Sequence, residues 1–219
     1  VSIDGLAPEH DVRRKPATYE RILKNIEGCQ VNIHLTVTRQ MMGRDGYLDE
    51  YMAFWCGRPE VLQIWCSLYS PQTGEQSPEI LTRQDREEVT RQLKALRHKY
   101  PQLLATDDMA DAYLKPPASP EHCIFSRMSV NVSADLETRV EPCIYGGNPD
   151  CSQCGCAATA GLEAVGAYVL AGPLRARHVM QASMAIGGFF DKFRGSPQRK
   201  ERWQPRPKIE TRGLVQIGK

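Results

Sequence analysis

The sequence predicts an α/β fold in which parallel strands alternate with helices, followed by a β-hairpin and helices that carry most of the cysteines. Strand-type and helix-type patterns alternate three times over residues 1–99, with successive strands about 30 residues apart. Such alternation is typical of parallel strands joined by helical crossovers. Five of the eight cysteines then fall within residues 123–156, which indicates a separate local site.

Composition and charge exclude several classes of protein. The chain has 219 residues, with 28 Lys and Arg against 26 Asp and Glu, a net charge of +2. Proteins that coat nucleic acids depend on a much larger positive field, so we expect no nucleic-acid partner. No apolar run approaches the roughly 20 residues of a membrane span, and no signal peptide is visible. We therefore expect a cytoplasmic protein with no membrane partner.

Each element of the first half follows from its pattern. Residues 1–4 form a short apolar strand that ends in a polar turn. Residues 31–38 alternate strictly between apolar and polar side chains, which predicts a strand with two different faces. The further predictions are helices over 16–27, 47–56 and 84–99 and a third strand over 61–69.

The polar face of the strand at 31–38 carries Asn32, His34 and Thr36. Strands of an open, doubly wound sheet are usually apolar on both faces. A barrel or partial barrel whose lumen holds a ligand would produce one polar face. An edge strand with a solvated face would produce the same pattern.

The second half begins after a proline-rich connector over 100–122, and we place the domain boundary at about residue 115. Residues 127–143 predict a β-hairpin with its turn at 135–137. Helices are expected over about 157–171 and 174–190. The predicted units are a strand–helix domain at 1–115, a cysteine-rich domain at 116–190 and a basic flexible tail at 191–219.

The cysteine spacing is the strongest chemical signal in the chain. Thiolates are soft ligands that select zinc or iron–sulfur clusters, and a Cys-x2-Cys step lets two sulfurs reach one metal site from a tight turn. A closed zinc site usually has two such steps, whereas this chain has one, so the spacing favours an iron–sulfur cluster over zinc or disulfides. The candidate ligands are Cys123, Cys143, Cys151, Cys154 and Cys156.

A second signal lies in VSIDGLAPEHDVRR, at the end of the first strand. Functional groups of parallel α/β barrels lie at the C-terminal ends of strands. Ser2, Asp4 and Arg14 supply a hydroxyl, a carboxylate and a guanidinium there, which suit an amino-acid-like or ribosyl ligand. On spacing alone, a capped turn before a helix is the simpler interpretation.

Taken together, the two signals resemble a known family. VSIDG, EHDVRR and the following helix start resemble the fourth strand and helix of radical S-adenosylmethionine enzymes. A cysteine, a hairpin, a second cysteine and a cysteine cluster follow in the order seen in the SPASM or twitch extension domains of that family. The resemblance covers about residues 1–160.

The resemblance implies the C-terminal half of a partial parallel (β/α)6 TIM-like barrel, followed by a small hairpin-plus-helix domain that binds an auxiliary [4Fe–4S] cluster. It implies a radical enzyme that cleaves S-adenosylmethionine reductively, with an electron donor such as flavodoxin or ferredoxin. Carried over by motif, the S-adenosylmethionine contacts would be made by Ser2, Asp4, Arg14, Asn32, His34 and Thr36.

One departure from the family limits this prediction. The Cys-x3-Cys-x2-Cys motif that holds the family's core cluster is absent from the sequence. We therefore expect the chain to be the C-terminal part of a longer enzyme, inactive alone, whose substrate is a peptide, a protein or a small molecule. The rival prediction is a zinc-binding interaction module on an α/β scaffold, without catalysis.

Overall fold

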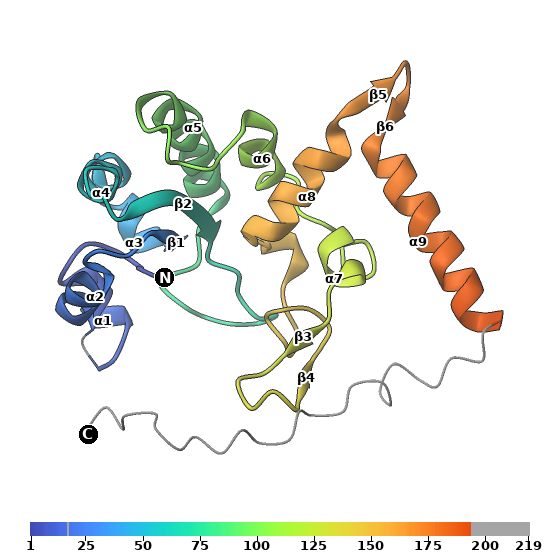
Figure 1. Cartoon of the computed structure of the whole chain (residues 1–219), viewed down its shortest axis with the longest axis horizontal. Coiled ribbons are helices and arrows are strands. Elements are labelled where there is room, and N and C mark those ends of the chain that lie inside the picture. The colour runs from blue at the N-terminus through green and yellow to red at the C-terminus, as the bar shows by residue number, and fades with distance from the viewer. Residues whose placement is uncertain (17, 194–219) are drawn as a thin grey trace.

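The computed structural model of the chain describes residues 1–16 and 18–193 and is drawn in Figure 1. Of the predicted basic tail at 191–219, residues 194–219 lie outside the described residues. The first half of the described chain contains these elements: α1 (Glu9–Arg13), α2 (Tyr19–Ile26), β1 (Val31–Val37), α3 (Arg39–Met42), α4 (Tyr47–Cys56), β2 (Val61–Leu68), α5 (Arg83–Lys99) and α6 (Asp107–Ala112).

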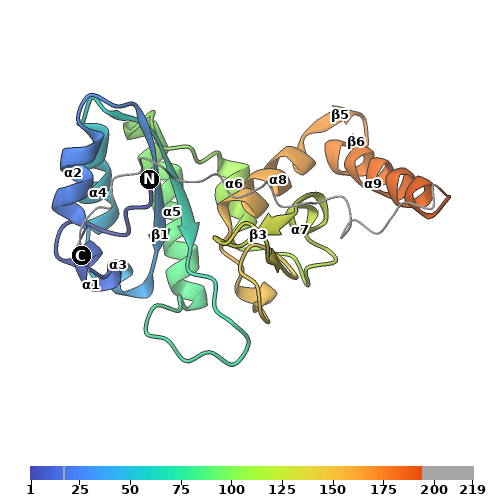
Figure 2. The same cartoon turned by 60° about the horizontal axis from the view of Figure 1, so that its bottom comes forward.

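The second half contains shorter elements around a longer helix pair. They are α7 (Ile124–Met128), β3 (Asn131–Val132), β4 (Arg139–Val140), the 3-10 turn η1 (Cys151–Gln153), α8 (Ala157–Ala167), β5 (Val169–Ala171), β6 (Leu174–Arg175) and α9 (Ala176–Phe193). In both views α9 extends away from the rest of the molecule, at the end opposite α2 and α4 (Figures 1 and 2).

The parallel sheet is built from segments that pair in sequence order. β1 pairs with β2 in parallel, with His34 opposite Trp65 and Thr36 opposite Ser67. Single parallel bridges add a segment on each side, one joining Ser2 to His34 and the other joining Ile64 to Leu103. The chain therefore has the predicted α/β class. Within the described residues the sheet does not close, and the half barrel stays a prediction.

The hydrophobic core lies against the apolar face of this sheet. Ile33, Leu35 and Val37 of β1 are fully buried, whereas the alternate side chains of β1 are half-buried or exposed. The core is completed by side chains of α2, α4 and α5, namely Tyr19, Ile26, Leu48, Tyr51, Met52, Trp55, Val89, Leu93 and Leu96. The alternation predicted for this strand is confirmed, because Ile33, Leu35 and Val37 are buried whereas the polar side chains between them are not.

Local hydrogen bonds explain where the main helices begin. Thr82 and Asp85 form a reciprocal capping box at the start of α5. The Oγ1 atom of Thr106 accepts from the Met109 amide at the start of α6. The start of α2 is capped from α1, since Asp11 accepts from the amides of Thr18 and Tyr19 at 2.7 and 2.9 Å. These two N–H groups lower the pKa of the Asp11 carboxyl.

Several sequence predictions are corrected here. The hairpin is confirmed but shorter than predicted, because residues 124–128 form α7 and only two residue pairs join β3 to β4. The connector over 100–122 contains α6, and the helix predicted to end at residue 171 ends at Ala167. A second hairpin, β5–β6, turns at Gly172. Residues 1–4 contribute one bridge and not a full strand.

The domain boundary predicted near residue 115 is crossed by close contacts. Ala157 and Ala160 of α8 belong to the same hydrophobic core as the strands and helices of the first half. α8 also packs on α6 and on the end of β2. No helix in the described part of the chain combines the length and apolar character needed to cross a membrane.

Candidate functional site

The five cysteines of residues 123–156 line one cavity, although the first two are well separated in the sequence. Cys123 precedes α7, Cys143 follows β4, and Cys156 precedes α8. Cys151 and Cys154 stand at the two ends of the turn η1. The remaining lining comes largely from the connector and from the segment at 144–150. The fold thus brings together all five predicted metal ligands.

The hairpin closes the sequence gap between Cys123 and Cys143. β3 and β4 run antiparallel, so the chain returns close to its starting point. The Ser126 hydroxyl donates to the Pro142 carbonyl at 2.8 Å and holds the two ends of this excursion together. Cys123 is fixed further, because its sulfur lies 3.4 Å from both the Ser126 amide nitrogen and the Thr159 hydroxyl oxygen of α8.

The Cys154–Cys156 segment is attached to the end of β2. The Leu68 amide donates to the Gly155 carbonyl at 2.8 Å, and the Gly155 amide donates to the Ser70 hydroxyl at 2.7 Å. A Cβ atom at position 155 would lie 2.2 Å from the Leu68 carbonyl oxygen, so only glycine fits. Backbone contact with β2 therefore fixes the spacing between these two cysteines.

The loop between Cys143 and Cys151 rests on the segment after β2. The Asn148 amide donates to the Gln72 side chain at 2.7 Å, and the Thr73 amide donates to the Asn148 carbonyl at 2.8 Å. The Asp150 amide donates to the Pro71 carbonyl at 2.9 Å. Gly146 and Gly147 both have positive φ, which lets the chain turn at this point.

Arg86 of α5 lies beneath the cysteine turn and is buried, with 7% of its surface exposed. Its guanidinium donates to the carbonyls of Gln153 at 3.1 Å, Cys154 at 2.6 Å and Tyr113 at 2.8 Å. Burial lowers the pKa of Arg86, and the neighbouring Cys154, Tyr113 and Asp150 act in the opposite direction. No sequence pattern distinguishes Arg86, since it lies in a helix whose other charged side chains are exposed or half-buried.

Burial also controls the ionisation of the thiols. It raises the pKa of Cys143 and Cys151, and it raises the pKa of Cys154 to about 11. These three thiols therefore stay protonated near neutral pH and become thiolates only when something at the site replaces the protons. Binding of a metal at thiols releases protons in this way.

The cavity itself is small. Its volume is about 20 Å³, which is close to the space needed for a single water molecule. Among the residues that the structure describes, no three Cys, His, Asp or Glu side chains are close enough together to hold one metal ion. The five cysteines line this space, and a bound group larger than a water molecule requires the cavity to widen.

A second, larger cavity lies near the ends of the first parallel segments, with a volume of about 920 Å³. Asp4, Arg14 and Thr36 line it, as do Arg13 and Glu79. The structure thus brings together three of the six predicted S-adenosylmethionine contacts. Ser2, Asn32 and His34 do not line this cavity.

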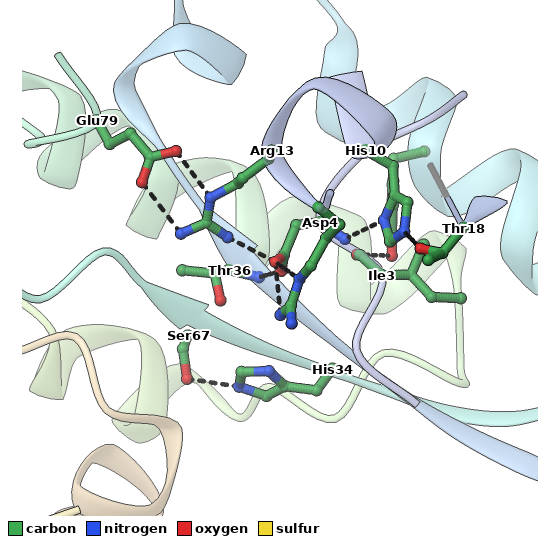
Figure 3. A network of polar contacts seen from close by, with 11 residues as sticks. Ile3, Asp4, His10, Arg13, Thr18, His34, Thr36, Ser67 and Glu79 are labelled. Atoms are coloured by element: carbon green, nitrogen blue, oxygen red, sulfur yellow. Dashed lines mark hydrogen bonds and ion pairs between the residues drawn. The ribbon is translucent and has the colours of Figure 1, made fainter. Parts of the chain in front are cut away.

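The carboxylate of Asp4 is the centre of a polar network in this cavity (Figure 3). Only 1% of Asp4 is exposed, and its Oδ2 atom lies 2.7 Å from Arg14 Nε and 2.6 Å from an Arg13 terminal nitrogen. Its Oδ1 atom accepts from the Thr36 amide at 3.1 Å. Arg13 also binds Glu79 at 2.7 Å, so a carboxylate from another loop completes the network.

Arg13 is a residue that the sequence analysis passed over in favour of its neighbour. Burial lowers its pKa, but the hydrogen bonds and charges of Glu79 and Asp4 outweigh burial and raise it. The Arg-Arg pair at 13–14 was visible in the sequence. The sequence does not show which carboxylates each arginine contacts, because Glu79 lies 66 positions from Arg13.

Two histidines surround this network without lining the cavity. His10 is fully buried, and its Nδ1 atom accepts from the Asp4 amide at 3.0 Å, so Nε2 carries the proton and donates to the Thr18 hydroxyl (Figure 3). His34 lies 2.8 Å from the Ser67 hydroxyl, which accepts from the Ala157 amide at 3.1 Å. Burial lowers the pKa of both imidazoles.

Ser67 therefore links the polar face of the sheet to the first residue of α8, directly after Cys156. Ser2 pairs with His34 through a single backbone bridge, and Asn32 is exposed on β1.

Comparison with known proteins adds no assignment to this geometry: the chain matches no protein-family model, and searches of curated proteins and of solved structures found no significant match.

Proposed function

We propose that this chain corresponds to the C-terminal part of a radical S-adenosylmethionine enzyme and that its cysteine cavity binds an auxiliary [4Fe–4S] cluster. The observation that carries the proposal is that Cys123, Cys143, Cys151, Cys154 and Cys156 all line one cavity. Five soft donors around one space form a donor set suited to an iron–sulfur cluster. When bound, such a cluster takes up or releases one electron.

The thiol ligands fit the cluster in chemistry, while the cavity must widen to admit it. The loop at 143–150 is the part best suited to move, because none of its residues is buried and it carries Gly146 and Gly147. Cys123 and Cys156 belong to the better-packed side, since both are buried beside α8. We propose that Cys123 and Cys143 are ligands, together with two of Cys151, Cys154 and Cys156.

The second cavity is the proposed site for S-adenosylmethionine. Its polar lining suits the carboxylate of an amino-acid group, because the guanidinium of Arg14 is partly exposed to the cavity, while Asp4 holds that guanidinium in place. The parallel segments pair in sequence order, as neighbouring strands of a barrel do. This order supports the half barrel that the family resemblance implies.

The test of the cysteine site is iron and sulfide content after anaerobic reconstitution of single variants. Cys123→Ala and Cys143→Ala are expected to lose the bound iron and the brown absorbance near 400 nm. Cys29→Ala, at an exposed thiol, and Cys66→Ala, at a buried thiol outside the cavity, are the matched controls and should keep both. A Cys143→Ala protein with full iron content would refute the shared site.

The wild-type protein separates the two candidate functions. About four iron and four sulfide per chain are expected for the cluster. A colourless protein that binds one zinc per chain would favour the zinc-binding module, and a protein that binds neither metal would overturn both.

A further inference from the structure

Arg86 is a buried cation with no anion beside it in the described part of the chain. All of its polar contacts are with uncharged backbone carbonyls, those of Tyr113, Gln153 and Cys154. No carboxylate of the described residues lies within ion-pair distance of its guanidinium. The carboxylate of Asp150, which lies in the cysteine segment, accepts instead from Ser152 and Gln153.

This arrangement differs from that of Asp4, another buried charged residue in the described part of the chain. Asp4 is more deeply buried than Arg86, with 1% against 7% of its surface exposed, and it is neutralised by two arginines. Buried charges are costly unless they are paired, because carbonyl dipoles replace only part of the lost hydration. The buried guanidinium of Arg86 donates to the cysteine turn, so a negative charge at that turn would stabilise it.

The cysteine cavity is the place where such a charge would arise. Arg86 donates to the carbonyl of Cys154 itself, at 2.6 Å, and to that of its neighbour Gln153. Thiolates and the cluster they bind carry net negative charge, whereas the free thiols carry none. The guanidinium is held in place from α5, so its charge does not depend on whether the site is filled.

We propose that Arg86 is the fixed counter-charge of the anionic centre bound at the cysteines and that it raises the reduction potential of that centre. This inference rests on the proposed function. When the cluster gains one electron from a reductant such as dithionite, which is oxidised, the site becomes more negative. A nearby cation stabilises the reduced form more than the oxidised form, so its removal lowers the midpoint potential.

The experiment compares Arg86→Met, which removes the charge and keeps an unbranched side chain, with Arg86→Lys, which keeps the charge but loses the planar fork. Arg97→Met is the matched control on the same helix, since Arg97 pairs with Asp107 at the surface and not with the cysteine turn. Each reconstituted protein is assayed for iron content and titrated with redox dyes, with the reduced cluster followed by electron paramagnetic resonance.

We expect iron-loaded Arg86→Met to have a lower midpoint potential than the wild type, with Arg86→Lys closer to the wild type and Arg97→Met unchanged. An unchanged potential in iron-loaded Arg86→Met would overturn the proposal. If Arg86→Met and Arg86→Gln both fail to hold iron, retention by Arg86→Lys supports the need for a charge, and loss in all three overturns it. A wild-type chain without iron would instead defeat the proposed function.

Discussion

The two halves of the molecule are held together by different means. Of the 30 buried apolar residues of the described chain, 25 lie before residue 115, whereas 15 of the 20 exposed large apolar residues lie after it. The first half has a core of large side chains such as Trp55, Tyr51 and Leu93. The second half buries mainly small side chains, such as those of Cys123, Cys156 and Ala160.

Burial of apolar side chains therefore accounts for the stability of the first half but not for that of the second. A region that buries little apolar surface needs another source of stability, for which small domains commonly use metals or disulfides. All eight cysteines are free thiols in this structure. The cysteine cavity therefore stands where the second half would otherwise have its core.

Removal of the proposed metal tests most strongly whether the two halves differ in their source of stability. After anaerobic reconstitution and chelation, we expect residues 123–157 to lose protection against amide hydrogen exchange, because the proposed cluster would take the place of a hydrophobic core there. β1 and β2 should keep their protection, since their core lies elsewhere. Mass-spectrometric hydrogen exchange measures both halves in one sample, and the Cys143→Ala protein provides the metal-free control. Equal loss in both halves, or none in either, would contradict the contrast.

A pair of isoleucines sharpens the comparison at the level of single side chains. Ile33 is fully buried in β1, and Ile186 in α9 is 57% exposed. Ile33→Ala is expected to lower the free energy of unfolding by about 2–5 kcal/mol, because it leaves a cavity. Ile186→Ala should stay within about 0.5 kcal/mol of the wild type. Urea unfolding followed by circular dichroism gives both values, and similar losses at the two sites would show that α9 is packed in solution.

The smallest expected effect is on the pH dependence of the stability of the first half. Burial holds the pKa of His10 below its ordinary value of 6.5, so the unfolded chain binds a proton more readily than the folded chain. The stability from the neutral imidazole is therefore fully present above about pH 6.5 and is lost as the pH falls below it. His10→Asn should flatten this loss.

His98→Asn, at an exposed position of α5, is the control for this measurement. Urea midpoints between pH 7.5 and 5.5 should fall as steeply in that variant as in the wild type. His34 is present in both variants, so the effect of its own lowered pKa on the pH dependence of stability is the same in each. An equal slope in His10→Asn and wild type would show that the buried imidazole of His10 does not titrate differently on unfolding.

Local patterns predicted the first half well, because its elements are long and each has one apolar face. The alternation of Val31 to Val37 and the helical spacing of Leu48, Tyr51, Met52 and Trp55 fixed two elements within a residue or two. The elements that were missed are short. α6 depends on the cap at Thr106 in a proline-rich segment, and β5–β6 on a two-residue turn at Gly172.

The cysteine site was predictable in its members, since a hairpin returns the chain to its start and so brings Cys143 back to Cys123. Its supports were not predictable. Arg86 reaches the site from α5, Ser67 from β2 and Ser70 from the segment after β2, and their contacts span 67 to 90 positions of sequence. No local pattern specifies such distant pairs. The same reason hides the contact between Arg13 and Glu79.

Gly155 has a consequence for how the cysteine half can be separated or transplanted. Its backbone lies directly against Leu68. The amide of Gly155 donates to the Ser70 hydroxyl, and the amide of Ala157 donates to the Ser67 hydroxyl. A protein engineer who moved residues 116–190 to another scaffold would carry the cysteines but leave behind the strand end that sets their separation. The portable unit of this molecule is the cysteine segment together with β2.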